Sequence, residues 1–338
     1  MEPKFSIVLV NYNGKGFTAE CVRSVLNSNY SNFEIILVDN ASTDGSIEEI
    51  ESLFGTDKRL KIIRNKQNLH FVGGNNIGLK NSSGEFAILL NNDTEAEPNW
   101  LKEIALVMQD RNICASQPKI LRYDNPSIID NTGGSLDRYG YAHGRGHDEL
   151  DKNQYNEVDE IFYAGATAMV LRMDTLKEVG ILDTKFLIYA EDVDLSWRIR
   201  LRGYSICYIP KSIVYHKGSK TVFRHPGKIR VFELSRTNRL STLIKNYSFY
   251  NLIRFLPAVI FFYISIFLKE ILFDRNRALA FTSISALITN IKILPYLLDK
   301  RKIVQKKIRK VSDKEVIKHM YNKSILIEQY FRPFVKLV

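Results

Sequence analysis

The chain has 338 residues, 45% hydrophobic and 25% charged, which excludes a disordered or collagen-like protein and allows a full apolar core. Its three cysteines, Cys21, Cys114 and Cys207, are widely spaced, which argues against a disulfide framework or a zinc knuckle and favours a reducing compartment. The net charge of +11 is uneven: residues 219–338 hold 24 Lys and Arg against 7 Asp and Glu, and residues 1–218 hold 24 against 30. This asymmetry predicts an anionic partner, membrane or nucleic acid, for the C-terminal part.

Strand and helix patterns alternate at the start of the chain. No basic and apolar leader precedes the first strand, so we expect no secretory signal and a cytoplasmic location. A loop is expected at 73–76, leading into a short helix. The alternation predicts an α/β fold with a doubly wound, mainly parallel sheet and flanking helices. Apolar runs predict strands over 5–10, 33–38, 60–64 and 85–90, and helical spacing predicts helices over 17–28 and 46–54.

The middle of the chain is less regular. Residues 124–160 are rich in Gly, Asp and Tyr and read as one long loop, a feature that is usually functional. Tyr139, Tyr141, His143 and Arg145 make this loop a candidate lid over a ligand. Beyond it, the pattern predicts strands over 161–171, 204–209 and 212–215, a helix over 174–179, and a helix that begins near 191 and ends at Gly203.

Polar residues follow three of the predicted strands, at 11–13, 39–40 and 91–93. Because ligands of open α/β sheets bind beyond the carboxyl ends of the strands, these side chains predict one binding edge. Asp39 is suited to a nucleotide base or ribose, although a turn-forming Asp is the simpler interpretation. Asp93 is suited to a divalent metal, although it could instead cap the next element.

Glu191, Asp192 and Asp194 crowd three carboxylates into four residues. Such carboxylates repel one another unless a metal, a cationic partner or proton transfer uses them. The alternative is an acidic helix start favoured by the helix dipole. Asp194 and Arg198 have i,i+4 spacing, so we expect Asp194 to be structural or orienting. Trp197 is more typical of a core residue than of one stacked on a ligand.

The segment Gly14-Lys-Gly16-Phe-Thr-Ala19 formally matches a dinucleotide-binding pattern, with Asp39 downstream. Three polar residues separate the strand from Gly14, and a dehydrogenase would leave Asp93, the carboxylate cluster and His216 unexplained. We therefore set this interpretation aside.

Beyond residue 235 the chain becomes apolar and basic. Residues 256–268 contain no charge, but 13 residues make only ~20 Å of helix, less than a ~30 Å hydrocarbon core. A second apolar stretch covers 278–298, and seven basic residues follow within 300–310. This order favours helices that lie on an anionic cytosolic membrane surface. A spanning helix, and a buried helical domain or oligomer interface, are the alternatives.

Four segments occur in an order that resembles the family 2 glycosyltransferases of GT-A fold, most closely the rhamnosyltransferase-like and galactofuranosyltransferase-like branch. The resemblance covers about residues 4–245 and rests on Ser6-Ile-Val-Leu-Val-Asn-Tyr-Asn13, Leu37-Val-Asp-Asn-Ala-Ser-Thr-Asp-Gly-Ser46, Leu89-Leu-Asn-Asn-Asp-Thr94 and Glu191-Asp-Val-Asp-Leu-Ser-Trp-Arg198.

The resemblance implies a role for each site residue. Asp192 would be the catalytic base, supported by Glu191 and Asp194. Asn91-Asn92-Asp93 would stand where the family has its DxD element, with the neutral Asn91 as a departure from it. The implied metal ligands are Asp93 and His216, for Mg²⁺ or Mn²⁺. The implied nucleotide-sugar residues are Asn11, Asn13, Asp39, Asn40, Asn76, Asn91 and Asn92, and the candidate acceptor residues are Trp197, Tyr139 and Arg145.

The resulting expectation is an inverting glycosyltransferase with a nucleotide-diphosphate donor, dTDP-rhamnose-like among the possibilities, and a glycan or lipid-linked acceptor of cell-envelope polysaccharide. Its GT-A domain would cover 1–235, with a nucleotide-sugar part at 1–120 and an acceptor part at 121–235. The basic helical region, 236–338, would hold it at the inner face of the membrane. A nucleotidyltransferase and a nucleic-acid-binding protein are the alternatives, and nucleic acid is the less favoured partner because the basic residues accompany apolar runs.

Overall fold

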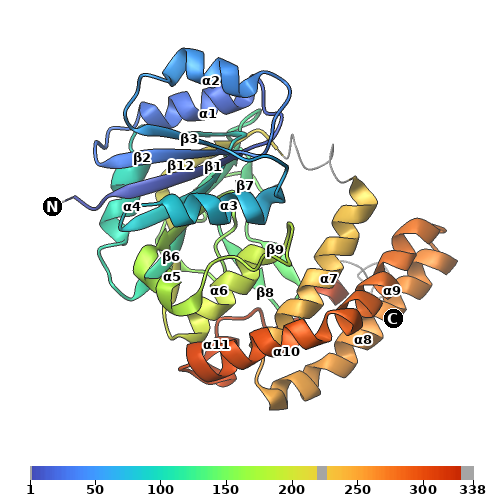
Figure 1. The fold of residues 1–338 in the computed structure, drawn as a ribbon. Helices are drawn as coiled ribbons and strands as arrows, with labels where there is room; N and C mark the ends of the chain where they lie inside the picture. Colours follow the sequence, from blue (N-terminus) through green and yellow to red (C-terminus); the bar gives the residue numbers. More distant parts are fainter. Residues whose placement is uncertain (1, 219–226, 329–338) are drawn as a thin grey trace.

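A ten-stranded mixed sheet forms the centre of the computed structural model, which describes residues 2–218 and 227–328 (Figure 1). Four neighbouring strands are parallel, in the order β4 (Phe86–Asn91), β1 (Phe5–Asn11), β2 (Phe33–Asp39) and β3 (Leu60–Arg64). Next to β4, β11 (Ala168–Arg172) runs antiparallel and joins β6 (Ile113–Arg122). The α/β class and flanking helices are therefore confirmed, with antiparallel strands on one side of the parallel part.

The other strands complete the sheet around β6. The long strand β12 (Ser205–His216) runs parallel to β6 and antiparallel to β5 (Thr94–Ala96) and β10 (Asp159–Glu160). β7 (Ile129–Asn131) pairs with β6, and β8 (Gly134–Leu136) forms a separate hairpin with β9 (Ala142–Gly144). The predicted strands at 204–209 and 212–215 are one strand, because a register shift between Ile209 and Ile213 lets pairing continue past Pro210.

Helices cover both faces of the sheet and bury two cores. Alternate residues of one strand enter different cores, as Ile7 and Val8 do, which explains why β1 reads as an uninterrupted apolar run. One face is covered by α1 (Phe17–Leu26), α2 (Ser46–Phe54) and α4 (Trp100–Val107), and the other by α3 (His70–Asn81), α5 (Met173–Val179) and α6 (Glu191–Leu201).

The prediction of a loop at 73–76 was wrong, because these residues lie inside α3. A Cβ on Gly74 would lie 2.7 Å from Val10 Cγ1, and one on Gly78 would lie 2.1 Å from Val8 Cγ1. These glycines therefore let the helix backbone approach β1 closely, although glycine weakens a helix by about 1 kcal/mol relative to alanine.

The segments on either side of residue 160 also differ from expectation. Residues 124–160 are not one loop, because they contain β7, β8, β9 and β10. The strand expected at 161–171 is regular only from Ala168. Before it, Tyr163 lies against Gly134 of β8 at an isolated bridge, so this stretch crosses to the hairpin instead of extending the sheet.

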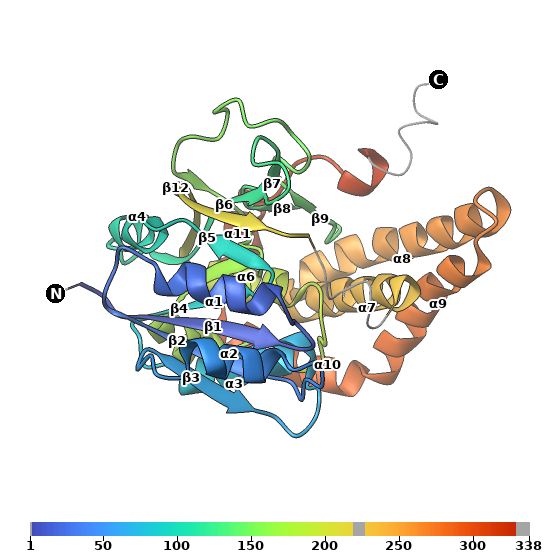
Figure 2. The ribbon, with the colours of Figure 1, turned by 90° about the horizontal axis from the view of Figure 1, so that it is seen from above.

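The C-terminal helices form a layer beside the sheet domain. Figure 2 shows α8 and α9 side by side, projecting away from the sheet. Their core is continuous with that of α6, because the Trp197 ring contacts Tyr247 edge to face at 4.8 Å. The boundary predicted at residue 235, between the sheet domain and the basic helical region, falls within α7. The elements are α7 (Lys228–Asn246), α8 (Phe249–Leu272), α9 (Arg277–Lys292), α10 (Leu294–Ile303), a π-helical turn (Val304–Ile308) and α11 (Asp313–Ile317).

Candidate functional site

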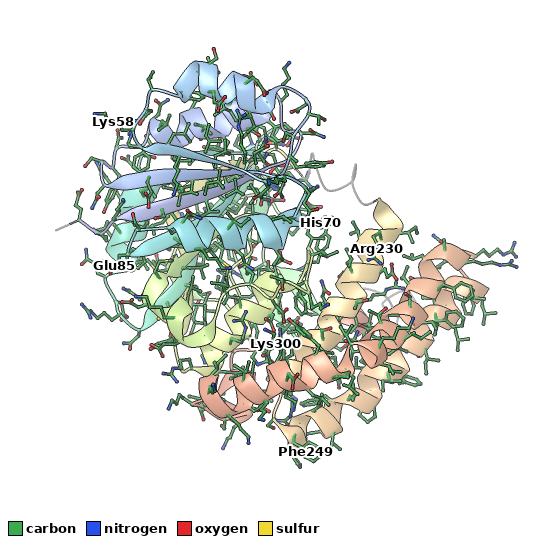
Figure 3. All side chains as sticks on the ribbon, in the orientation of Figure 1. Lys58, His70, Glu85, Arg230, Phe249 and Lys300 are labelled. Carbon is green, nitrogen blue, oxygen red and sulfur yellow. The ribbon has the colours of Figure 1, made fainter. Side chains whose placement is uncertain are left out.

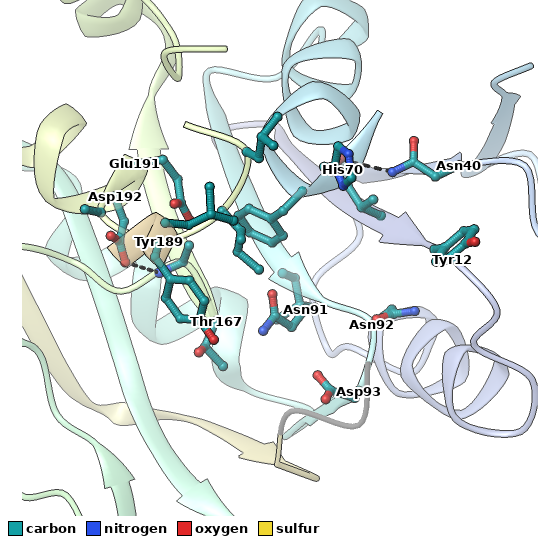
Figure 4. A pocket seen from close by; sticks show the side chains of 18 of the residues that line it. Tyr12, Asn40, His70, Asn91, Asn92, Asp93, Thr167, Tyr189, Glu191 and Asp192 are labelled. Carbon is teal, nitrogen blue, oxygen red and sulfur yellow. Dashed lines mark hydrogen bonds between the residues drawn. The ribbon is translucent and has the colours of Figure 1, made fainter. Parts of the chain in front are cut away.

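A cavity of about 680 Å³ opens at the carboxyl ends of β1, β2 and β4, as expected for an open α/β sheet. Figure 4 shows Glu191 and Asp192 on one side of it, Tyr12 and Asn40 on the opposite side, and Asn91 and Asp93 between them. We call it the donor cavity. Three polar clusters distant in sequence therefore meet at one place, and Arg230 and Leu234 of α7 add a further wall.

Helix α6 contributes its first two residues, Glu191 and Asp192, to the lining of this cavity. Every residue of α6 is buried except Asp192. The two residues before the helix, Tyr189 and Ala190, have φ values of 68° and 62°, in the left-handed region that non-glycine residues rarely occupy. We call them the left-handed pair. Such conformations cost about 1–3 kcal/mol each, so the surrounding structure must hold them in place.

The adjacent carboxylates Glu191 and Asp192 have different environments. Burial, and then the charge of Asp192, raise the pKa of Glu191 well above its usual value, and Glu191 Oε2 has no hydrogen-bond partner among the described residues. Burial also raises the pKa of Asp192, but the backbone N–H groups of Val193 and Ala166 donate to its oxygens and oppose that shift. We therefore assign the proton of the pair to Glu191 and the negative charge to Asp192, whose raised pKa makes it a stronger base.

Helix α7 holds the chain that leads into α6. The Asn238 amide donates to the carbonyls of Ile188 and Tyr189, at 2.9 and 2.8 Å, and so bridges the start of the left-handed pair. Asn238 is 2% exposed, so these bonds are shielded from water. The conformation that presents Asp192 thus depends on a residue almost 50 positions further along the chain.

A buried ion network joins α7 to α6. Lys245 Nζ lies 2.6 Å from Asp183 Oδ2 and 3.0 Å from Asp194 Oδ1. Asp194 also accepts from Arg198 Nε at 3.0 Å and from the Asn246 amide at 3.0 Å. All of the hydrogen bonds to Asp194 are therefore structural, in agreement with the orienting role predicted from the i,i+4 spacing.

Asp93 and His216 lie together at the end of the donor cavity, as predicted. Their Oδ1 and Nε2 atoms are 3.4 Å apart, and His216 Nε2 is buried without a hydrogen-bond partner among the described residues. His216 Nδ1 lies 2.9 Å from Asp130 Oδ2. Burial lowers the pKa of His216, but its contacts with Asp130 and Asp93 outweigh burial and raise that pKa to about 9.

The predicted nucleotide residues divide into two groups. Asn40, Asn91 and Asn92 line the donor cavity. Asn11, Asn13, Asp39 and Asn76 do not line it, and their side chains bond within the protein. Asn11 donates to Asp39, Asp39 accepts from Ser42, and Asn76 bonds both backbone groups of Leu182. Asn13 likewise bonds the backbone N–H of Thr43. In the structure, Asn11, Asn13 and Asn76 therefore tie neighbouring segments of the protein together.

The candidate acceptor residues are not brought together. Trp197 is fully buried. Tyr139 packs edge to face against Phe255 and Phe262 of α8, and Arg145 pairs with Asp159 while its guanidinium covers the Tyr155 and Tyr208 rings. Neither Tyr139 nor Arg145 lines the donor cavity.

Several cavity residues were missed by sequence reasoning. Tyr12 lies inside a segment that was singled out, so its position after β1 was an available signal. His70, Phe71 and Arg230 carried no pattern of their own, because the loop expected at 73–76 placed the start of the helix after His70 and Phe71, and the segment around Arg230 was not predicted to reach the cavity. Asp130 lies in the irregular 124–160 region, where no spacing connected it with His216.

Residues 6–179 match the family model described as glycosyl transferase family 2, which is more than half of the chain. The chain belongs to this family. Among curated relatives, an uncharacterized glycosyltransferase of Haemophilus influenzae is 26% identical over 324 residues, covering 92% of this chain and 98% of the relative. The glycosyltransferase GlyG of Streptococcus pneumoniae is 28% identical over 112 residues, covering 33% of this chain and 37% of its own length.

Solved structures share the fold of this glycosyltransferase. A structure of GalNAc-T7 with UDP, GalNAc and Mn²⁺ aligns over 99% of this chain and 57% of its own, with 17% identity and a TM-score of 0.61. A mannosyltransferase from Pyrobaculum calidifontis in complex with GDP-Man and Mn²⁺ aligns over 91% of this chain and 82% of its own, with 13% identity and a TM-score of 0.54.

Replacing Lys245 with Met tests the ion network of this glycosyltransferase. The change leaves the buried carboxylates of Asp183 and Asp194 without their shared cation, so we expect about 3–5 kcal/mol lower stability at pH 7 in urea unfolding. Lys177→Met removes the exposed pair with Asp174 and should change stability by less than about 0.5 kcal/mol.

The comparison of wild type with Lys245→Met also predicts how their difference in stability depends on pH. Burial opposes the shift, but the ion pair and hydrogen bond with Lys245 lower the pKa of Asp183 from 3.8 to about 2. A lowered carboxyl pKa stabilises the fold above the unfolded value and stops doing so as pH falls through the folded value. The stability gap between wild type and Lys245→Met should therefore narrow between about pH 4 and pH 2. A gap that is constant over this range would contradict the assignment.

Proposed function

We propose that the chain is an inverting glycosyltransferase that moves a sugar from a nucleotide-diphosphate donor to a hydroxyl of a glycan or lipid-linked acceptor. The observation that carries the proposal is that Asp192 alone among α6 residues is not buried, and that it faces a cavity of nucleotide-sugar size. A dTDP-rhamnose-like donor and the rhamnosyltransferase-like and galactofuranosyltransferase-like branch are the finer assignments that we propose from the ordered sequence segments.

Asp192 acts as general base in this proposal. It takes the proton of the acceptor hydroxyl as the hydroxyl oxygen attacks the anomeric carbon from the face opposite the diphosphate. The bond from that carbon to the diphosphate oxygen breaks, and the electron pair leaves with the diphosphate. Inversion is supported by the environment of Glu191: burial, and then the charge of Asp192, raise its pKa and make it a poor nucleophile, whereas a retaining carboxylate mechanism needs a second carboxylate as nucleophile.

Asp93 and His216 fit a divalent metal ion such as Mn²⁺ or Mg²⁺. The fit rests on the buried Nε2 of His216, which lies 3.4 Å from Asp93 Oδ1 and makes no hydrogen bond among the described residues, with Asp130 on Nδ1 to fix the ring orientation. No group of three or more His, Cys, Asp or Glu side chains in the described part of the chain could hold such an ion, so the donor diphosphate would supply further ligands. A bound ion would stabilise the negative charge that develops on the diphosphate.

The change Asp192→Asn tests the base. The amide keeps the size of the side chain but accepts no proton, so transfer should fall by about 10²–10⁴-fold while donor affinity stays within about threefold. Nucleoside-diphosphate release across a panel of donors measures transfer, and calorimetry measures donor binding. Asp174→Asn, at an exposed carboxylate paired with Lys177, is the control. Normal transfer by Asp192→Asn would remove Asp192 as the base.

The change Asp130→Asn tests the metal proposal without relying on activity. It removes the carboxylate that orients His216, so affinity for Mn²⁺ in the presence of nucleoside diphosphate should fall about 10–100-fold, measured by electron paramagnetic resonance of free Mn²⁺. Asp148→Asn changes an exposed neighbouring carboxylate and should leave the affinity unchanged. Equal Mn²⁺ affinity in both variants would show that His216 is not held for a metal.

We further propose that the α8–α9 hairpin binds an anionic membrane surface. By length and composition, α8 could cross a bilayer, and 28% of its most apolar stretch is buried in the protein. The buried side of α8 packs against the protein, where Glu270 pairs with Arg236 of α7 at 2.6 Å. This arrangement favours an interfacial position. The exposed apolar side chains of α8 include Phe249, Tyr250, Ile253, Ile260, Phe261, Ile264, Leu268 and Leu272.

A triple variant, Phe261→Ser, Ile264→Ser and Leu268→Ser, tests this surface. Loss of three apolar contacts should weaken flotation with phosphatidylcholine–phosphatidylglycerol vesicles at least ~10-fold. The matched control, Leu53→Ser, Leu106→Ser and Val158→Ser, removes three exposed apolar side chains outside the hairpin and should float like wild type. Equal flotation of both variants, or salt-sensitive binding to RNA without binding to vesicles, would overturn the membrane proposal.

A further inference from the structure

The short loop before β11, residues 164–167, contacts the candidate base through its backbone. The N–H of Ala166 donates to Asp192 Oδ2 at 3.2 Å, and Ala166 and Thr167 line the donor cavity together with Asp192. A backbone N–H can donate to a fixed carboxylate only while its peptide group keeps one orientation. The contacts that fix the 164–167 loop therefore affect the base.

Both ends of the 164–167 loop are bonded to strands of the sheet. The N–H of Gly165 donates to Gln117 Oε1 of β6 at 2.6 Å, and the carbonyl of Thr167 accepts from the N–H of Asn91 at the end of β4 at 2.9 Å. The bond to Asn91 continues the backbone pairing of β4 with β11, and any residue could make it. The bond to Gln117 uses a side chain, so it depends on the residue type.

Gln117 is a polar residue on a buried strand. Residues 113–121 of β6 are all buried, and Gln117 is 1% exposed. A buried amide is unfavourable unless it is hydrogen-bonded, and both ends of this one are: Oε1 accepts from Gly165, and Nε2 donates to Asn131 Oδ1 at 2.9 Å. Because a backbone N–H can only donate, the Gln117 amide has a single orientation in this network.

Asn131 of β7 completes the support. Its Oδ1 also accepts from the N–H of Gly133 at 2.7 Å, so its side chain is held by its own turn. The residue before it, Asp130, lies 2.9 Å from His216 Nδ1. Successive side chains of a strand point in opposite directions. Two neighbouring residues of one short strand thus support the proposed metal ligand and, through Gln117, the loop at the proposed base.

We propose that Gln117 and Asn131 are positioning residues for the base, which together hold the 164–167 loop so that the Ala166 N–H donates to Asp192. Neither residue lines the donor cavity, so both act through the loop. The inference rests on the proposed function for the role of Asp192 as base. It gives β6 and β7 a part in the site, although they contribute no residue to the cavity wall.

The Ala166 N–H affects the charge of Asp192. Burial raises the pKa of Asp192, and the N–H groups of Val193 and Ala166 oppose that rise. Loss of the Ala166 bond should therefore raise this pKa further. Replacing Gln117 leaves the other charged and titratable groups around Asp192 in place. They are Glu191 of α6, Tyr163 before the loop, Arg230 and Arg239 of α7, and Asp93 and His216 across the donor cavity.

The pH profile of transfer tests the positioning role. Gln117→Met keeps the size of the side chain and removes both of its hydrogen bonds. The base works only when it is deprotonated, so a raised pKa should move the low-pH limb of kcat/KM upward by about one pH unit. Nucleoside-diphosphate release measures kcat/KM, with the donor of the panel that gives the highest rate. A limb at the wild-type position would overturn the proposal.

Two further variants separate positioning from stability. Ile113→Ala shortens a buried apolar side chain at the start of the same strand, so it should lower stability in urea unfolding and leave the limb in place. Asn131→Leu removes the anchor of Gln117 at a half-buried position and should move the limb in the same direction as Gln117→Met, by a smaller amount. It provides the test if Gln117→Met does not fold. An equal movement in Ile113→Ala would rule out a specific role for Gln117.

Amide hydrogen exchange, resolved by nuclear magnetic resonance, tests the geometry without a substrate. Gln117→Met should speed exchange at both Gly165 and Ala166 at least ~10-fold, because the loop loses its side-chain anchor. Asp192→Ala removes only the acceptor of Ala166 and should speed exchange at Ala166 alone. Wild-type exchange at Gly165 and Ala166 in Gln117→Met would contradict the proposal.

Failure of this inference and failure of the proposed function have different signatures. If Gln117→Met speeds exchange in the loop and moves the limb, both stand. If it speeds exchange but no donor yields transfer with any variant or with wild type, the contact of the loop with Asp192 stands and the glycosyltransferase mechanism falls. If transfer by Gln117→Met has the wild-type limb, the mechanism stands and the positioning role falls.

Discussion

The left-handed pair, Tyr189 and Ala190, is the constraint on which the candidate active site depends. Two consecutive non-glycine residues in this conformation are unfavourable in isolation, and together they cost about 2–6 kcal/mol. They end the loop after Asp183 and start α6 at the point where Asp192 reaches the cavity. The structure offsets the cost with the Asn238 amide, which bonds two carbonyls of the turn, and with the ion network around Lys245, which fixes the next turn of α6.

These contacts explain how three adjacent acidic residues have separate roles. Asp194 faces the protein interior, and its carboxylate oxygens contact Arg198, Lys245 and Asn246. Glu191 is buried beside Asp192, and its Oε2 has no donor among the described residues, so burial raises its pKa. Asp192 receives the backbone N–H groups of Val193 and Ala166, which oppose the rise in its own pKa. Under the proposed function, this difference makes Asp192 the carboxylate that accepts the proton of a substrate.

The C-terminal helices are part of this arrangement. α7 lines the donor cavity, holds the left-handed pair and carries Lys245, while its Arg236 forms a buried pair with Glu270 of α8. Buried contacts thus lead from the exposed apolar side of α8, whose projecting position is visible in Figure 3, to the wall of the donor cavity. Under the membrane proposal, the helix that contacts the membrane is attached to the helix that holds the left-handed pair.

The sequence by itself determined the parts of this protein that local pattern controls. Buried strands read as apolar runs, so β1, β2 and β4 were predictable, and polar groups at their ends indicated the binding edge. The tertiary structure decided the rest. The placement of Gly74 and Gly78 inside α3 depends on their contact with β1, and the position of Asp130 depends on the pairing of β7 with β6. Only the fold showed that Asp192 alone in α6 is not fully buried, whereas Asp194 is buried against Asn246 of α7, about 50 residues away along the chain.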